Sequence, residues 1–101
     1  MSQALLRHAV PARDAGVLKT LQTTPGVGPS IARDLYALGM RGVRDLKGQD
    51  PQKLYERSNR IAGATQDRCL LYVFRCAVYY AETPNPQAAK LKWWNWKDST
   101  R

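Results

Sequence analysis

The chain is poor in the residues on which most catalytic sites depend. It has one histidine, His8, and two cysteines, Cys69 and Cys76, among 101 residues. His8 falls in a terminal segment with little structural signal, so we expect no base–nucleophile pair. No pair of acidic residues has a spacing that suggests metal-assisted phosphodiester cleavage. We therefore expect a protein that is not an enzyme and has no cofactor, no metal and no small-molecule substrate.

Long hydrophobic runs are also missing. The longest apolar region, residues 69–81, is interrupted by Arg75 and is shorter than the roughly 20 residues that a membrane helix needs. The N-terminus lacks the order of a signal peptide, because Leu5 and Leu6 are followed at once by Arg7. We expect a soluble cytoplasmic protein with no membrane partner.

The two cysteines are expected to be reduced. They are separated by seven positions in one predicted helix, which places them about 10 Å apart along its axis. That distance is too long for a disulfide. We expect two buried thiols that pack as small hydrophobic groups.

Positive charge is in excess. Sixteen Lys and Arg residues against eight Asp and Glu give a formal charge of +8, spread along the chain without a basic tail. This pattern favours an acidic partner surface, and nucleic acid before others.

No segment alternates with period two for long enough to form a sheet, so the sequence predicts an all-α fold. Helices are expected over residues 12–23, 29–38, 51–61 and 66–82, with a short connecting helix between Gly42 and Gly48. Start signals are Pro29 and Asp50-Pro51, and the stop signals include Gly39. The chain divides into a loosely ordered N-terminal arm (1–10), a helical domain (11–82) and a Trp-rich tail packed on that domain (83–101).

The helix predicted over residues 66–82 has Arg75 as its only charge between Arg68 and Glu82. A helix that is apolar nearly all round is expected at the centre of the core. Arg68 and Arg75 contact phosphate or a partner, or they pair with nearby carboxylates (Asp67, Glu82) or helix-end carbonyls. The second interpretation is favoured.

The tail contains three tryptophans, at positions 93, 94 and 96, beside Lys90, Lys92 and Lys97. Such a cluster is typical of a stacking platform for unpaired bases. It also suits tryptophans that cover the central helix and fix the tail to the core. Packing is the favoured interpretation.

The segment Pro25-Gly-Val-Gly-Pro29 joins the first two predicted helices. With Pro29 as the first helical residue, the cap position is Gly28, which has no side chain to satisfy the first amides. The amides of Ser30 and Ile31 then remain free for an anion. The alternative is a turn that only fixes the angle between two helices. The net charge, Arg33 and Lys19 favour anion binding, and Asp34 opposes it.

The stretch LQTTPGVGPSIARDLYALG, residues 21–39, resembles the helix-hairpin-helix motif of DNA repair and replication proteins. Together with DLKG, DPQKLYER, DRCLLYVFRCAVYY and LKWWNWKD, it resembles the small bacterial pathogenicity-locus family, whose members are sometimes labelled mitomycin-resistance proteins. The resemblance covers about residues 17–98. It implies a compact double helix-hairpin-helix, SAM-like bundle of about five helices, and DNA binding.

When the helix-hairpin-helix motif is aligned with this sequence, the resemblance implies that the hairpin consists of Gly26, Val27 and Gly28. It also implies that Ser30 and Ile31 supply the amide donors. DNA-binding members of the wider motif often have Lys at the position of Ser30, which weakens the expectation of tight binding unless Arg33 substitutes for it. In the second hairpin Thr65 replaces the second glycine and can cap the helix internally, so that hairpin is expected to be structural.

The sequence therefore predicts non-sequence-specific DNA binding, accessory to DNA repair or processing. The candidate phosphate-binding residues surround the first hairpin and are Gly26, Val27, Gly28, Ser30, Ile31, Arg33, Lys19, Arg41 and Arg44, with Lys47 beside the last two. For the connector residues Arg41, Arg44 and Lys47, the alternative is a solvated position without a partner. The alternative function is a protein-interaction adaptor that uses the apolar helix and the Trp-rich tail. A protein partner or a homo-oligomer is expected in addition to DNA.

Overall fold

A computed structural model describes residues 10–98, and over this range the chain is helical without strands. The prediction of an all-α fold is confirmed for these residues. Most of the predicted N-terminal arm lies outside the described residues. Within them, the α-helices are α2 (Ala15–Leu21), α3 (Pro29–Ala37), α4 (Pro51–Ala62) and α5 (Cys69–Glu82), and the 3-10 segments are η1 (Ala12–Asp14), η2 (Val43–Leu46), η3 (Ala88–Leu91) and η4 (Trp93–Trp96).

Local signals set most helix ends. Asp50 precedes α4, and its Oδ1 accepts a hydrogen bond from the Gln52 amide at 2.9 Å. The same helix ends at Gly63, whose φ of 72° is the left-handed conformation that glycine adopts most easily. Pro29 is the first residue of α3. The predicted starts of α3 and α4 are confirmed, and each helix ends within one residue of the predicted position.

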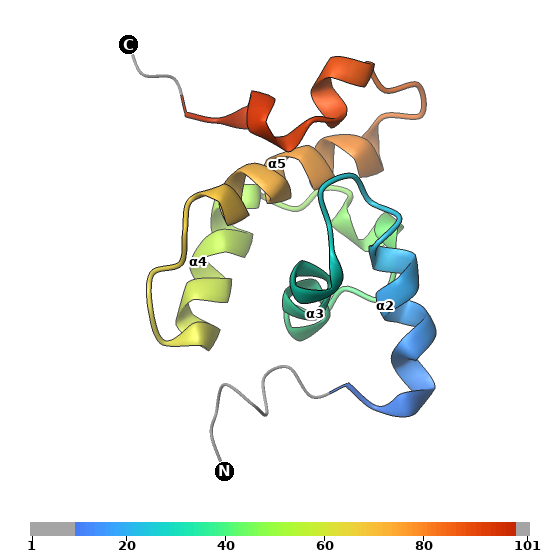
Figure 1. Ribbon diagram of the computed structural model, residues 1–101, viewed down its shortest axis with the longest axis vertical. Helices are drawn as coiled ribbons and strands as arrows, with labels where there is room; N and C mark the ends of the chain where they lie inside the picture. The colour runs from blue at the N-terminus through green and yellow to red at the C-terminus, as the bar shows by residue number, and fades with distance from the viewer. Residues whose placement is uncertain (1–9, 99–101) are drawn as a thin grey trace.

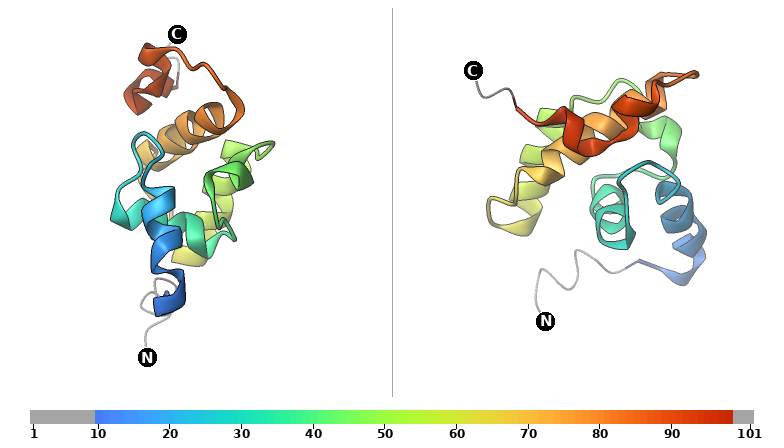
Figure 2. Two further views of the ribbon diagram at one scale, coloured as in Figure 1. Left: turned by 90° about the vertical axis from the view of Figure 1, so that its right-hand side faces the viewer. Right: turned by 45° about the horizontal axis from the view of Figure 1, so that its top comes forward.

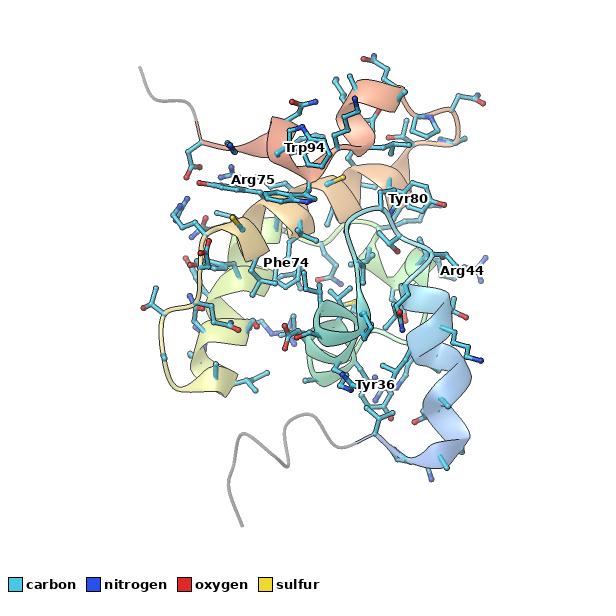
Figure 3. The ribbon with its side chains drawn as sticks, in the orientation of Figure 1. Tyr36, Arg44, Phe74, Arg75, Tyr80 and Trp94 are labelled. Carbon is cyan, nitrogen blue, oxygen red and sulfur yellow. The ribbon has the colours of Figure 1, made fainter. Side chains whose placement is uncertain are left out.

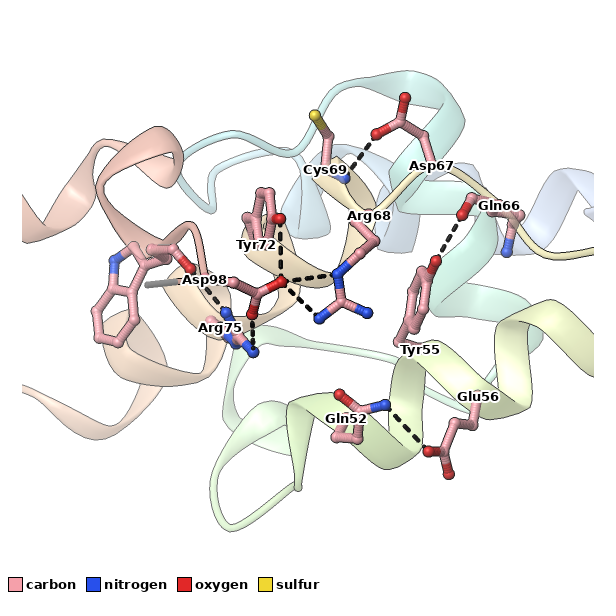
Figure 4. A network of polar contacts seen from close by, with 11 residues as sticks. Gln52, Tyr55, Glu56, Gln66, Asp67, Arg68, Cys69, Tyr72, Arg75 and Asp98 are labelled. Carbon is pink, nitrogen blue, oxygen red and sulfur yellow. Dashed lines mark hydrogen bonds and ion pairs between the residues drawn. The ribbon is translucent and has the colours of Figure 1, made fainter. Parts of the chain in front are cut away.

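The start of α5 differs from the prediction. The sequence placed it at Gln66 with Thr65 as the cap, but the helix begins at Cys69. The Gln66 amide donates to Asn59 Oδ1 at 2.9 Å, and the Gln66 carbonyl accepts from the Tyr55 hydroxyl (Figure 4). These bonds to α4 hold Gln66 outside the helix, so Thr65 is too far back to cap it.

Helix α5 lies across α3 and α4 and separates them from the tail (Figures 1 and 2). Phe74, Leu71 and Ala77 are fully buried on its inner face. Figure 3 shows Phe74 directed from α5 into the space between α4 and α3. The expected central position of this helix is confirmed.

The tail crosses the outer side of α5 as η3 and η4 (Figure 2). Trp96 packs on Tyr79 with ring centroids 5.4 Å apart, and its Nε1 donates to the Lys90 carbonyl at 2.8 Å. Trp93 is partly buried against the core. Trp94 remains 49% exposed. The packing interpretation therefore describes Trp93 and Trp96 and leaves Trp94 at the surface.

Arg68 and Arg75 hold the tail at Asp98 (Figure 4). Their guanidinium nitrogens lie 2.7 Å and 2.9 Å from its carboxylate oxygens. Arg75 also donates to the Trp96 carbonyl at 2.8 Å. The favoured interpretation, pairing within the molecule, is confirmed, but the carboxylate is Asp98 rather than the two considered from the sequence.

The cysteines differ in burial. Cys76 is buried as expected, whereas Cys69 is exposed, and both are reduced. The expectation of two buried thiols is wrong for Cys69 because the later start of α5 makes it the first helical residue. Among residues 10–98, no helix is long and apolar enough to cross a membrane.

Candidate nucleic-acid interface

The first hairpin is fixed from inside by its middle residue. Val27 belongs to the hydrophobic core and is 6% exposed. Its amide donates to the Thr24 carbonyl at 3.1 Å, which closes the turn. Gly26 has a φ of 82°, so the chain reverses there in a conformation that glycine adopts without strain. The buried valine leaves the flanking glycines nearer the surface.

The N-terminus of α3 is not capped by the protein itself. Gly28 is its cap residue, with extended backbone and no side chain to accept a hydrogen bond. The first bond of the helix runs from the Ala32 amide to the Gly28 carbonyl at 2.9 Å. Within the described part of the chain, no acceptor pairs with the amide of Ser30 or Ile31. We call Gly28, Ser30 and Ile31 the α3 N-terminal site.

The aromatic tail covers one edge of the hairpin and leaves the other open. A Cβ atom at Gly26 would lie 3.2 Å from Trp93 Cδ1, so the two residues are in close contact. A Cβ atom at Gly28 would have no neighbour within 4 Å. Among residues 10–98, nothing therefore blocks the approach of an anion to the α3 N-terminal site from the side of Gly28.

Two of the predicted basic residues belong to the elements that flank the hairpin. Lys19 is exposed in the last turn of α2, two residues before the helix ends. Arg33 is partly buried on α3, one turn beyond Ser30. Both are therefore candidates to add positive charge near the start of α3.

Arg41 is held at the other end of α3. Its Nη1 donates to the Tyr36 and Met40 carbonyls at 3.0 Å and 3.1 Å, and its guanidinium lies 3.7 Å from the centre of the Tyr36 ring. Nine helical residues span about 13 Å. The structure therefore separates Arg41 from the α3 N-terminal site by the length of the helix.

The other connector cations are at the surface. Arg44 is exposed in η2, and Lys47 is exposed directly after it. Figure 3 shows the Arg44 side chain pointing away from the body of the molecule. Both remain candidates for contacts outside the α3 N-terminal site.

A cavity of about 340 Å³ lies beside the hairpin. We call it the hairpin cavity. Its lining comes from α3, from the loop before α5, from α5 and from the tail, and consists of Gly26, Ile31, Asp34, Gln66, Asp67, Cys69, Leu70, Val73 and Trp93. Sequence reasoning did not find this cavity, because its lining residues come from segments that only the tertiary fold brings together.

Asp67 and Cys69 give the hairpin cavity its polar edge. The Cys69 amide donates to Asp67 Oδ1 at 2.8 Å, and this bond holds the pKa of the Asp67 carboxyl below its usual value. The hydrogen bond to Asp67 raises the pKa of the Cys69 thiol. At neutral pH the pair is therefore an ionised carboxylate beside a neutral thiol.

Comparisons with known proteins agree with the resemblance stated above. No solved structure matches the chain. The chain is 39% identical over 62 residues to the mitomycin resistance protein McrB of Streptomyces lavendulae, a match that covers 61% of this chain and 59% of that protein. A family model described as pathogenicity locus (Cdd1) matches residues 14–101. Because this match covers most of the sequence, the chain belongs to the pathogenicity locus family.

Proposed function

We propose that the protein binds DNA without sequence preference, by holding backbone phosphates at the α3 N-terminal site. The observation that carries the proposal concerns the amides of Ser30 and Ile31: among residues 10–98 no acceptor pairs with them, and no atom lies within 4 Å of a Cβ placed at Gly28. Helix N-termini of this kind bind phosphate because their amides point at the ligand and the helix dipole favours negative charge.

The proposal includes a fold assignment. The helix pairs α2–α3 and α4–α5 form a double helix-hairpin-helix, or SAM-like, domain. In support, Gly26 and Gly63 occupy equivalent places in the two loops, and both have left-handed backbone. This assignment agrees with the motif in the sequence and accounts for the order of the elements.

Each group at the site has a role in holding phosphate. The Ser30 and Ile31 amides donate to the phosphate oxygens, and the exposed Ser30 hydroxyl adds a third donor. Gly28 lets the phosphate approach because it has no Cβ in the way. Arg33 and Lys19 contribute charge. These contacts reach only the DNA backbone, so they carry no sequence information.

A site with so few contacts binds weakly. We expect a dissociation constant on the order of 10⁻⁴–10⁻⁶ M at physiological salt, rising steeply with salt concentration. Weak binding of this kind suits an accessory component of DNA repair or processing, or an oligomer that presents several sites.

The proposal is tested by fluorescence anisotropy with a short paired duplex at two salt concentrations. Gly28→Glu places a carboxylate where the phosphate binds, and we expect a loss of affinity of more than about tenfold. Thr65→Glu is the matched control, because it adds the same charge at the equivalent position of the second loop. Thermal melts verify that both variants fold. Equal binding by wild type and Gly28→Glu would contradict the proposed site.

The alternative function is a protein-interaction adaptor. The observation that favours it is Trp94, which is 49% exposed on the tail, since exposed tryptophans are common at protein interfaces. If the wild type fails to bind duplex DNA even at low salt, this function is preferred. Its own test is a pull-down in which Trp94→Ala loses a captured partner while the protein remains folded.

A further inference from the structure

The hairpin cavity and the α3 N-terminal site share a residue. Ile31 contributes its amide to the proposed phosphate site, and it also lines the cavity. The neighbouring Gly26 lines the cavity as well. A phosphate on the amides therefore places the nucleotide attached to it at the edge of the cavity.

We propose that the hairpin cavity receives an unpaired nucleobase of the bound DNA. This inference rests on the proposed function and names the kind of DNA that the site prefers: a strand with a bulged or otherwise unpaired nucleotide. The volume of about 340 Å³ lies at the lower end of the range for small-ligand sites, which suits one planar base.

The walls of the cavity suit the faces of a base. Ile31, Leu70 and Val73 provide apolar surface. Trp93 adds an aromatic ring, on which any base can stack because every base has a π face. The ring is held in place, since it contacts Gly26 on one side and Trp94 packs against it edge-on at 5.7 Å between centroids.

The polar edge of the cavity suits a base better than a second phosphate. Asp67 lies on this edge, and its carboxylate repels phosphate but accepts hydrogen bonds from the amino group of a base. The adjacent α3 N-terminal site has the opposite character, with free donors and no acidic residue in the first turn. The two sites thus match the two parts of one nucleotide: its phosphate and its base.

The test compares a paired duplex with the same duplex carrying a single bulged 2-aminopurine, a fluorescent base with an exocyclic amino group. We expect the wild type to bind the bulged DNA at least about fivefold more tightly, the lower limit for stacking one base on an aromatic side chain. We also expect the 2-aminopurine emission to fall on binding because the base stacks on Trp93.

Variants that fill the cavity test its role. Cys69 is exposed at the first position of α5, so Cys69→Phe adds volume at the cavity without disturbing the core. We expect this variant to bind paired DNA like wild type and to lose the preference for the bulge. Cys69→Ser is the size-matched control. If Cys69→Phe proves unstable in a thermal melt, Trp93→Leu serves instead and is expected to lose the fluorescence change.

The outcomes separate the two proposals. Equal affinity for paired and bulged DNA, or an emission that does not change, would overturn the base site and leave the phosphate site standing. A bulge preference that survives in Cys69→Phe would also overturn it. No binding of paired DNA, or binding unaffected by Gly28→Glu, would instead remove the proposed function itself. If the cavity instead receives a side chain of a partner protein, the affinities for paired and bulged DNA should be equal.

Discussion

The two loops that precede α3 and α5 have a similar backbone turn but differ in how the N-terminus of the following helix is capped. Each turns through a glycine with left-handed backbone, Gly26 with a φ of 82° and Gly63 with a φ of 72°. Before α5, the Asp67 carboxylate accepts the first amide of the helix. Before α3, Gly28 has no side chain with which to do so, and among residues 10–98 no acceptor pairs with the first amides.

This difference decides which loop suits an anion. The Asp67 carboxylate already offsets the partial positive charge at the start of α5, and it repels further negative charge. The start of α3 has no acidic residue in its first turn, so its positive end remains available. The protein thus contains one helix N-terminus that is capped by its own carboxylate and one that has no capping side chain.

The largest expected effect on stability comes from replacing the left-handed glycine of each loop by alanine. Alanine in a left-handed conformation costs about 1–2 kcal/mol, so Gly63→Ala should lower the free energy of unfolding by that amount. Gly26→Ala should cost more, because its Cβ would also press on Trp93 at 3.2 Å. Urea unfolding of both variants measures the difference. Equal losses would show that Trp93 does not constrain the first hairpin.

A smaller effect is expected where the second loop is attached to α4. Tyr55→Phe removes the hydroxyl that donates to the Gln66 carbonyl, and we expect the free energy of unfolding to fall by about 1 kcal/mol. Affinity for paired DNA should remain that of wild type, because the proposed phosphate site lies at the first loop. Urea unfolding and anisotropy measure the two quantities, and a parallel loss of affinity would contradict the assigned difference between the loops.

The smallest effect concerns the tail, whose Trp93 contacts the first loop at Gly26. Hydrogen bonds from Arg68 and then Arg75 hold the pKa of the Asp98 carboxyl below its usual value. A carboxyl with a depressed pKa stabilises the fold above its unfolded pKa of about 4, and the contribution disappears as the pH falls through its lower, folded value. The attachment of the tail should therefore weaken at acid pH.

Asp98→Asn tests this pH dependence. Its melting temperature should lie below that of wild type at pH 7, and the gap should narrow progressively as the pH falls below about 4. Because the ion pairs are partly exposed, added salt should also reduce the gap. A gap that stays constant from neutral to acid pH would show that the carboxylate charge does not hold the tail.

Much of the fold could be predicted because its boundaries have local causes. Asp50 followed by Pro51 starts a helix through the cap and the fixed φ of proline, and Gly63 ends one through its left-handed backbone. The same local reasoning identified Gly28 as a cap residue without a capping side chain. Such features depend on a few adjacent residues and are visible in the sequence.

What could not be predicted depends on contacts between distant segments. Helix α5 begins at Cys69 and not at the predicted Gln66, because side chains of α4 hydrogen-bond to the Gln66 backbone. The residues near Gln66 in the sequence give no sign of these bonds. Asp98 could not be identified as the partner of Arg68 from helix spacing, since it lies in the tail. The hairpin cavity was missed for the same reason.

The most direct test of the open helix N-terminus is an NMR titration of the ¹⁵N-labelled protein with a short paired duplex. The Ser30 and Ile31 amides should shift together and saturate, and the shifts should weaken when salt is added. The Gln52 amide, which donates to Asp50 at the capped start of α4, is the internal reference and should not move. Unchanged Ser30 and Ile31 signals at saturating DNA would contradict the account.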